Sequence, residues 1–153
     1  MSSKASSLPV QEIFLSHSSR DRVFAHKVAE VIRRHGLPVW YSPTNIVGAQ
    51  QWHDEIGRAL RRCDWFIALL SPYAVRSVWV KRERVYALNN ARYEDRIIPV
   101  LYKPCDPSAL SWVLQGFQII DCTTDFDTGC RDLLRVWGIG YVAATRPQRR
   151  RRL

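Results

Sequence analysis

The sequence predicts an α/β fold in which one parallel sheet is covered by helices on both faces. Short, nearly continuous apolar runs alternate along the chain with longer segments whose apolar residues recur at helical spacing. The apolar runs contain few polar residues, which is typical of strands that are buried on both faces of a parallel sheet. At 153 residues, with 46% apolar and 24% charged residues, the chain fits one globular domain with one hydrophobic core.

Five apolar runs are expected to form the strands of this sheet. In chain order they are residues 13–15, 37–41, 65–70, 97–102 and 117–120. Parallel strands joined by right-handed helical crossovers predict the strand order 2-1-3-4-5, which gives a flavodoxin-like three-layer sandwich. In such sheets ligands bind beyond the carboxyl ends of the strands, where the strand order reverses. Here that place is the ends of the first three strands.

The segments between these runs are expected to form helices that pack on the sheet. Three of them share an apolar stripe with the spacing i, i+4, i+7 and i+8: Phe24, Val28, Val31 and Ile32, then Trp52, Ile56, Ala59, Leu60 and Cys63, then Phe126, Cys130, Leu133, Leu134 and Trp137. A fourth helix is expected over residues 76–93, with Val78, Val85 and Leu88 on its inner side. A shorter helix is expected over residues 107–114, beginning at Pro107.

The turn after the first expected strand lacks a phosphate-binding glycine motif. It contains neither the GxGxxG pattern of dinucleotide-binding dehydrogenases nor the GxxxxGK[ST] pattern of P-loop nucleotidases. The backbone cradle that these patterns supply for phosphates is therefore missing, which argues against both enzyme classes. Asp21 is the only acid near the expected strand ends. A response-regulator receiver needs an acidic cluster there and is excluded on that ground.

The cysteines and the apolar runs indicate a cytoplasmic protein without a membrane segment. The four cysteines, at positions 63, 105, 122 and 130, form no CxxC pair and have no histidine at metal-ligand spacing, so no metal site is predicted. They are interpreted as reduced thiols in a reducing compartment. Residues 1–10 lack the apolar stretch of a secretory signal and are expected to be a disordered lead-in. The longest apolar run, residues 65–70, is far shorter than the ~20 residues of a membrane span.

The positive charge is concentrated near the end of the sequence. Of the net charge of +9, five charges belong to Arg146, Arg149, Arg150, Arg151 and Arg152, which leaves an ordinary +4 for the remainder. Residues 141–153 are interpreted as a solvated basic tail or a truncated linker. Because the rest of the chain has no second basic stripe with interleaved aromatic residues, nucleic-acid binding is not expected.

Four segments of the chain resemble the TIR (Toll/interleukin-1 receptor) domain family, particularly its bacterial members. The segments are residues 12–21, residues 39–48 with 52–60, residues 66–72 with 77–83, and residues 97–101. Each is weakly specific alone, but their order and spacing together are specific. The resemblance covers about residues 11–138, so residues 11–140 are assigned to one TIR domain.

The resemblance implies a catalytic role for Glu83. Some TIR domains only recruit partners, whereas others cleave NAD⁺, and the enzymatic group carries a glutamate in a WxxxE pattern on the helix after the third strand. Here that pattern is Trp79-Val-Lys-Arg-Glu83. The i, i+4 spacing places Trp79 and Glu83 on one helix face. The spacing alone favours a surface residue flanked by Lys81, Arg82 and Arg84, and it is the resemblance that favours the catalytic role.

One carboxylate is chemically sufficient for this cleavage. Breaking the nicotinamide–ribose bond develops oxocarbenium character at the ribose carbon, which a nearby carboxylate can stabilise or attack. Nicotinamide in NAD⁺ is already cationic and leaves as a neutral molecule, so no second acid is required. NAD⁺ is then the substrate, and no cofactor or metal is predicted.

Five residues are assigned to substrate binding, namely His17, Ser18, Ser42, Trp52 and Trp79. The first three lie at expected strand ends, where polar side chains face a ligand, although Ser18 could instead cap a helix. In resembling enzymes an aromatic residue at the place of Trp52 flanks the nicotinamide, where an indole attracts a pyridinium by cation–π interaction. Trp52 also begins an apolar stripe, so a core position is equally open, and Trp79 could line the pocket or support Glu83.

The connection over residues 42–51 is longer than most strand-to-helix links, and long ordered loops are often functional. In TIR domains this loop mediates head-to-tail contacts, which in enzymatic members complete the active site. The resemblance therefore implies homotypic TIR–TIR self-association through residues 42–51.

The favoured interpretation is an NAD⁺ glycohydrolase or cyclase that acts in bacterial defence signalling and gives ADP-ribose or a cyclic variant. One alternative is a non-enzymatic TIR signalling module that acts by homotypic TIR–TIR interaction. A second is a nucleoside-processing enzyme of the deoxyribosyltransferase type, which also uses a glutamate on N-glycosides. The complete set of TIR segments argues against the second alternative.

Overall fold

The computed structural model describes residues 10–42, 49–106 and 117–144, without the side chains of residues 49–53, 78 and 79. Its strands form one parallel sheet, and they are β1 (Ile13–Ser16), β2 (Val39–Trp40), β3 (Trp65–Leu70), β4 (Ile97–Leu101) and β5 (Ile120–Asp121). Their order is β2-β1-β3-β4-β5 and every pairing is parallel, which confirms the expected flavodoxin-like sheet.

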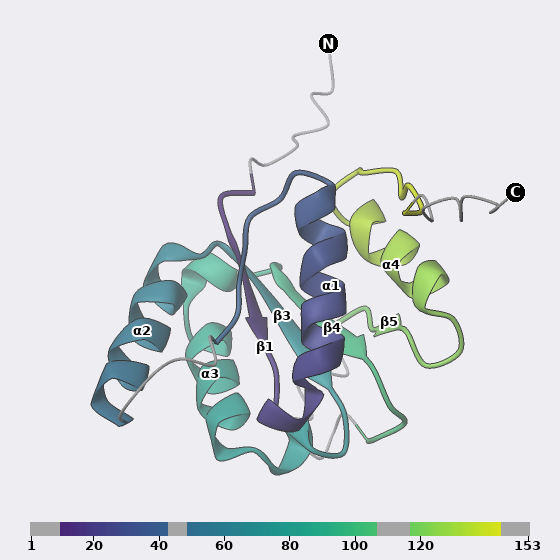
Figure 1. Ribbon diagram of the computed structural model, residues 1–153. Coiled ribbons are helices and arrows are strands. Elements are labelled where there is room, and N and C mark those ends of the chain that lie inside the picture. Colours follow the sequence, from purple (N-terminus) through teal and green to yellow (C-terminus); the bar gives the residue numbers. More distant parts are fainter. Residues whose placement is uncertain (1–9, 43–48, 107–116, 145–153) are drawn as a thin grey trace, which may run out of the picture.

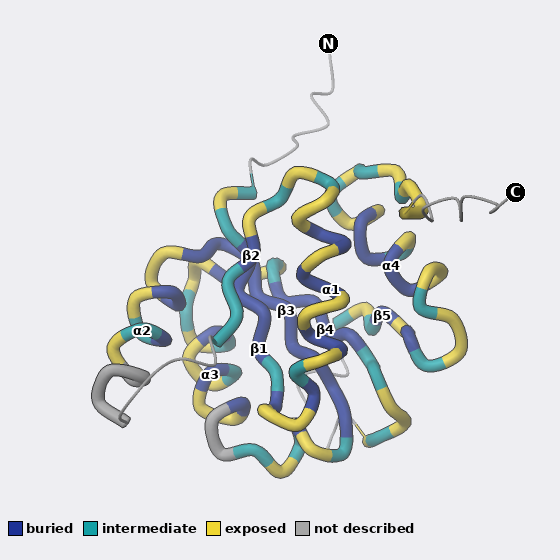
Figure 2. The backbone as a smooth tube through the Cα atoms, viewed as in Figure 1, coloured by how far each residue is buried: buried dark blue, intermediate teal, exposed yellow. Residues whose placement is uncertain are grey.

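Helices cover both faces of this sheet and complete a three-layer sandwich (Figure 1). α1 (Arg22–Arg34) and α4 (Phe126–Arg135) lie on one face, and α2 (Ala49–Arg62) and α3 (Val78–Leu88) lie on the other. Three short 3-10 turns join these elements, namely η1 (Ser19–Asp21), η2 (Ala74–Arg76) and η3 (Ala91–Tyr93). The strands are the most buried part of the molecule, and the helices are exposed on their outer sides (Figure 2).

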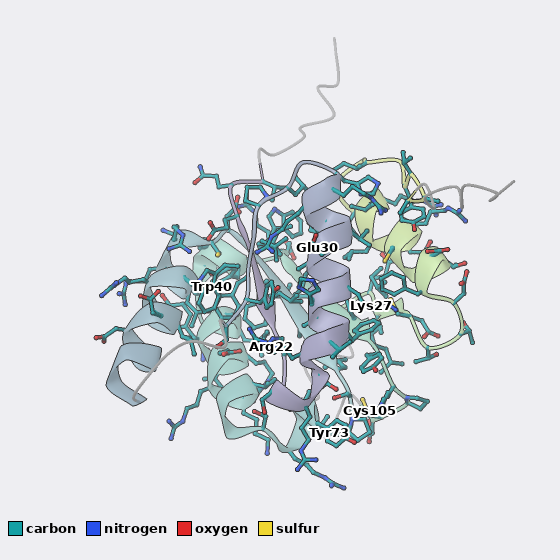
Figure 3. All side chains as sticks on the ribbon, viewed as in Figure 1. Arg22, Lys27, Glu30, Trp40, Tyr73 and Cys105 are labelled. Atoms are coloured by element: carbon teal, nitrogen blue, oxygen red, sulfur yellow. The ribbon has the colours of Figure 1, made fainter. Side chains whose placement is uncertain are left out.

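The alternation of side chains along each strand decides which helix they meet. In β1, Ile13 and Leu15 pack in the core under α1, whereas Phe14 packs in the core under α2 and α3. Phe14 stacks on Trp40 with ring centroids 5.1 Å apart, and Figure 3 shows Trp40 on the side of α2. Ser16 lies two residues after Phe14, so the two side chains point to the same face of the sheet. The hydroxyl of Ser16 therefore faces α3 at the carboxyl end of the strand.

The two edge strands are shorter than the sequence predicts. β2 consists of Val39 and Trp40 rather than residues 37–41, and β5 of Ile120 and Asp121 rather than residues 117–120. Pro38 has no N–H to donate, and only its carbonyl joins the sheet, where it accepts from the N–H of Ile13 at 2.9 Å. An apolar run thus marks the position of an edge strand without fixing its length.

The helix expected over residues 76–93 is three elements. Residues 74–76 form η2, α3 begins after its N-cap Ser77, and residues 91–93 form η3. The expected inner position of Val85 is wrong, because its side chain is 46% exposed. Among the described side chains of α3, which do not include Val78, the buried ones are Val80, Glu83 and Ala87, so the inner face of the helix includes a carboxylate. The inner face of a helix cannot be recognised from the sequence as an apolar stripe when one of its residues is charged.

Several expectations lie outside the described residues, namely the helix over residues 107–114, the lead-in up to residue 9 and the arginines of the tail. Within the described part, no helix is long and apolar enough to cross a bilayer.

Candidate active site at the strand ends

Two buried pairs, each a serine hydroxyl and a carboxylate, occupy the carboxyl end of the sheet. Ser16 Oγ donates a hydrogen bond of 2.5 Å to Glu83 Oε2, which ties the end of β1 to α3. Ser71 Oγ, directly after β3, donates to Asp21 Oδ2, which ties the end of β3 to η1. All four residues are buried. The pairs lie on opposite faces of the sheet, since Ser16 faces α3 and Asp21 immediately precedes α1.

Local helix geometry turns Glu83 toward the sheet. Ser77 Oγ caps α3 by accepting a hydrogen bond of 3.3 Å from the N–H of Val80. Glu83 follows Val80 by three residues and precedes Ala87 by four, so the three share one face. Glu83 is only 7% exposed, which rules out the surface interpretation of this residue.

The surroundings of Glu83 favour its protonated form. Burial raises the pKa of this carboxyl from 4.5 to about 7, and the hydrogen bond from Ser16 acts in the opposite direction. None of the ion pairs among the described residues includes Glu83. A carboxyl with this pKa is partly ionised at neutral pH. Its ionised form is poorly solvated, which strengthens its interaction with a developing positive charge.

His17 is neutral in this environment. Burial and the neighbouring charge of Arg22 lower the pKa of the imidazole to about 4. The ring stands edge-on to Tyr41 with centroids 5.9 Å apart. Nε2 is buried and has no hydrogen-bond partner in the described part of the chain. His17 can therefore offer a ligand a neutral nitrogen, but not a positive charge.

The other residues assigned to substrate binding have varied surroundings. Ser18 is buried and accepts a hydrogen bond of 3.3 Å from the N–H of Arg20, so it has the capping role that the sequence left open. Ser42 is half-buried just beyond β2. Trp52 belongs to α2 and Trp79 to α3, but their side chains lie outside the described part of the structure.

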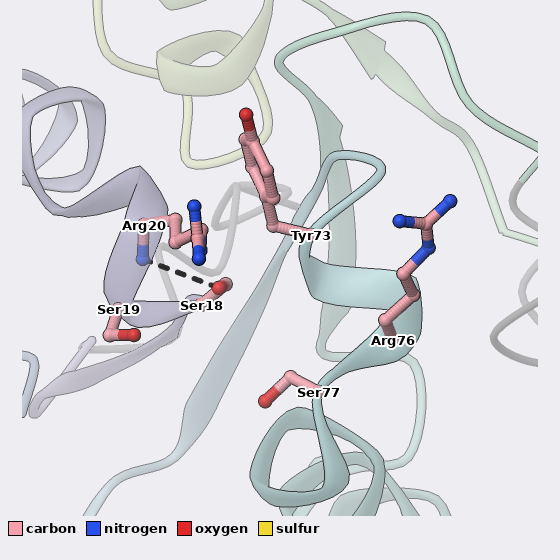
Figure 4. Close-up of a pocket in the computed structure, with 6 residues that line it drawn as sticks. All are labelled: Ser18, Ser19, Arg20, Tyr73, Arg76 and Ser77. Atoms are coloured by element: carbon pink, nitrogen blue, oxygen red, sulfur yellow. Dashed lines mark hydrogen bonds between the residues drawn. The ribbon is translucent and has the colours of Figure 1, made fainter.

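A pocket of about 510 Å³ lies between η1 and residues 73–77, the segment that leads into α3. It is lined by Ser18, Ser19, Arg20, Tyr73, Arg76 and Ser77 (Figure 4). Glu83, His17 and Ser42 are not among these six. Four of these residues, Arg20, Tyr73, Arg76 and Ser77, were not predicted from the sequence as functional candidates. The only feature of the sequence that pointed to them was their place after the expected ends of the first and third strands.

Asp21, the acid that follows the first strand in sequence, is held inside the fold. Besides the bond from Ser71, its Oδ1 is buried and has no hydrogen-bond partner among the described residues. Burial raises the pKa of this carboxyl, against the lowering effects of Ser71 and Lys103. Ser71 Oγ also accepts from the N–H of Ala74 at 3.1 Å, so the pair fixes the turn after β3.

The cysteines pack as the sequence analysis expected of small apolar residues. Cys63, Cys122 and Cys130 are buried within the hydrophobic clusters, and Cys105 is half-buried. Among the described residues, no group of three or more histidine, cysteine or acidic side chains could hold a metal ion.

Residues 13–134 match the TIR domain family, and the chain belongs to that family. A relative in sequence is NAD(+) hydrolase TcpC of Escherichia coli O6:H1 strain CFT073. The two are 25% identical over 92 residues, which cover 58% of this chain and 30% of TcpC. The chain thus spans less than a third of the length of that relative.

Solved structures of TIR domains share the fold. The TIR domain of the Toll-related receptor TRR-2 from Hydra magnipapillata superimposes with a TM-score of 0.67 at 17% identity, covering 82% of this chain and 96% of that one. The TIR domains of the activated Roq1 resistosome give 0.65 at 16% identity, covering 82% and 98%. A metazoan TIR-STING receptor from C. gigas gives 0.69 at 17% identity, covering 86% and 40%. At these identities the likeness concerns the fold alone.

Proposed function

We propose that this TIR domain cleaves NAD⁺ at the bond between nicotinamide and ribose, with Glu83 as the catalytic carboxylate. The observation that carries the proposal is the burial of Glu83 against Ser16 at the carboxyl end of the sheet. Open α/β sheets bind ligands at this end, and a carboxyl with a strongly raised pKa is typical of active sites. The similarity to NAD(+) hydrolase TcpC supports NAD⁺ as the substrate.

In this mechanism Glu83 acts in its ionised form. As the bond to nicotinamide lengthens, positive charge develops on the ribose carbon, and the carboxylate stabilises that charge or attacks the carbon. The electron pair of the broken bond neutralises the pyridinium, so nicotinamide leaves without needing a proton. The hydrogen bond from Ser16 fixes the orientation of the carboxylate before substrate binds.

The remaining assigned residues would hold the substrate. His17, Ser18 and Ser42 offer neutral hydrogen-bonding groups near the strand ends, and Trp52 and Trp79 belong to the helices on the side of Glu83. Capture of the ribosyl group by water would give ADP-ribose, and capture by an adenine nitrogen would give a cyclic variant. Mass analysis of the products distinguishes the two. We place this activity in the cytoplasm, as NAD⁺ consumption in defence signalling.

The test is incubation of the purified protein with NAD⁺, with nicotinamide release followed by chromatography. Glu83→Gln should lower turnover at least 100-fold, because it removes the one charge that stabilises the transition state. Arg92→Gln is a matched control, since Arg92 is exposed in η3, outside the candidate site. Wild-type turnover in folded Glu83→Gln protein would remove Glu83 from the mechanism. Absence of turnover in the wild-type protein, alone and at high concentration, would leave the non-enzymatic TIR module.

We also propose that assembly through residues 42–51 supports the activity. A head-to-tail contact that completes the site makes activity depend on association between copies. Specific activity should therefore rise with protein concentration. Specific activity that stays constant over a hundredfold dilution, with all protein monomeric by light scattering, would contradict this part of the proposal.

A further inference from the structure

The pocket between η1 and the start of α3 has the composition of an anion-binding site. Among the described residues, its lining contains two arginines, three serines and one tyrosine, and no carboxylate. Figure 4 shows Ser18, Ser19 and Arg20 on one wall, with Tyr73, Arg76 and Ser77 on the other. A volume of about 510 Å³ falls within the range of small-molecule sites.

The cationic side chains around this pocket are Arg20, Arg76 and Lys103. The guanidinium of Arg20 lies 5.6 Å from the ring centroid of Tyr73, and Lys103 Nζ lies 5.4 Å from the same centroid. None of the ion pairs among the described residues includes Arg20, Arg76 or Lys103. Asp21 is buried with Ser71, and Lys103 acts on its carboxyl from farther away than an ion pair. The described lining residues therefore contribute two positive charges to the pocket, from Arg20 and Arg76.

Uncharged donors complement these cations. Ser18 Oγ and Ser77 Oγ each accept a hydrogen bond from a backbone N–H, which leaves both hydroxyl protons for a ligand. Ser77 is the N-cap of the eleven-residue helix α3, and a helix N-terminus favours an anion. Arginines that converge with hydroxyl donors are the usual receptors of phosphate oxygens.

We propose that this pocket binds the diphosphate of the dinucleotide substrate. The inference rests on the proposed function and deepens it, because it names residues that nothing in the resemblance assigned. Ser18, in the pocket, is two residues from Ser16, the partner of Glu83, so their Cα atoms are at most ~7 Å apart. In NAD⁺ the diphosphate and nicotinamide are attached to the same ribose, so the diphosphate lies close to the carbon that bears nicotinamide. A dinucleotide whose diphosphate lies in the pocket would therefore place its ribose close to the end of β1, where Ser16 holds Glu83.

This arrangement also explains how a TIR sheet binds a dinucleotide without a glycine-rich turn. A GxGxxG turn brings backbone N–H groups to the phosphates, whereas the turn after β1 here has side chains at every position of residues 16–21. The charge for the phosphates then comes from Arg20 and Arg76 instead. Both residues are exposed, so their side chains can rotate onto a ligand without disturbing the core.

Steady-state kinetics on Arg20→Gln, Arg76→Gln and the double variant test the inference, with Arg92→Gln as the control of equal charge change. Each single variant should raise KM for NAD⁺ on the order of tenfold while kcat changes less than about twofold, because a charge-assisted hydrogen bond outside the reacting centre contributes to binding. An unchanged KM in the double variant would overturn the inference and leave the proposed function standing.

Calorimetry with ADP and with inorganic pyrophosphate provides a second arm that needs no turnover. The affinity for each ligand is measured on the Glu83→Gln protein and on the same protein carrying the arginine substitutions. Binding that weakens on the order of tenfold with either arginine change supports the anion site, even if the wild-type protein does not cleave NAD⁺. Binding that is equal in all variants would overturn the site. If ADP binding depends on the arginines but KM for NAD⁺ does not, the pocket takes a free nucleotide and the substrate assignment is wrong.

Discussion

Ser16 and Glu83 lie 67 positions apart in the sequence, yet a hydrogen bond of 2.5 Å joins their side chains inside the fold. The bond connects the first strand of the sheet to the helix that follows the third. Because β1 and β3 are neighbours in the sheet, the position of the carboxylate depends on the order of the strands. The candidate catalytic group is thereby fixed by the central part of the fold, and rigid elements position such groups more accurately than loops.

Ser16→Ala should make the activity more sensitive to acid. The hydroxyl favours the ionised form of Glu83, so its loss raises the pKa of the carboxyl further above the present value of about 7. Less carboxylate is then available at neutral pH, and kcat at pH 7 should fall about fivefold. The measurement is the pH dependence of kcat, whose acid limb should move to higher pH.

Ser16→Thr is the matched control, because it retains the hydroxyl on a strand position that accepts β-branched residues. Its acid limb should stay close to that of the wild-type protein. A pH profile in Ser16→Ala that coincides with the wild-type profile would show that the bond does not tune Glu83.

Glu83→Gln should stabilise the fold, and more so at alkaline than at acid pH. The pKa of Glu83 is about 7 in the folded protein and about 4.5 in the unfolded chain, so between these values only the folded state retains the proton. The wild-type protein therefore loses up to about 3 kcal/mol of stability as the pH rises through this window, whereas the glutamine variant loses nothing from this site. Urea denaturation of both proteins at pH 5 and pH 8 measures the difference. A stability difference that does not grow with pH would contradict the raised pKa.

The sheet could be predicted from sequence because its central strands are buried on both faces. Residues 65–70 are apolar throughout and form β3 with the predicted bounds. The edge strands could not be delimited, because Leu37 and Phe117 pack on the core without pairing in the sheet. An apolar run shows that a segment is buried. It predicts the length of a strand only in the centre of the sheet, where the segment pairs with a strand on each side.

The candidate site was predictable only in part. The spacing of Trp79 and Glu83 could not show that the carboxylate faces inward, because the neighbouring Lys81, Arg82 and Arg84 made the segment look solvent-exposed. The partner Ser16 was equally hidden, since it depends on strand parity and on the packing of α3 over β1. Such contacts join residues distant in sequence, which local spacing does not reveal.

His17→Phe should protect the fold against acid. The pKa of His17 is lowered from 6.5 to about 4 in the folded protein, so below pH 6.5 the unfolded chain takes up a proton that the folded protein does not. The wild-type protein loses up to about 3 kcal/mol of stability as the pH falls from 6.5 to 4, and phenylalanine removes this loss. The aromatic ring can keep its contact with Tyr41. Chemical denaturation at pH 4.5 and pH 7 checks the prediction, which fails if both proteins respond to acid alike.

Ser71→Ala should be among the most destabilising changes at the strand ends. Ser71 is fully buried, and its hydroxyl both donates to Asp21 and accepts from the N–H of Ala74. Alanine removes both bonds and leaves a buried carboxyl whose Oδ1 already has no partner in the described part of the chain. The cost should be about 2–4 kcal/mol, since unsatisfied buried polar groups incur most of their desolvation penalty.

Asp21→Asn should cost less than Ser71→Ala, because the amide oxygen still accepts from Ser71 and the buried site no longer has to hold a charge. Ser19→Ala, an exposed neighbour in η1, should change stability by less than about 0.5 kcal/mol. Thermal and urea denaturation of the three variants at pH 7 would give this order. If Ser71→Ala were as stable as Ser19→Ala, the buried pair would have no part in holding the turn after β3 against η1. The walls of the pocket would then be positioned by apolar packing alone.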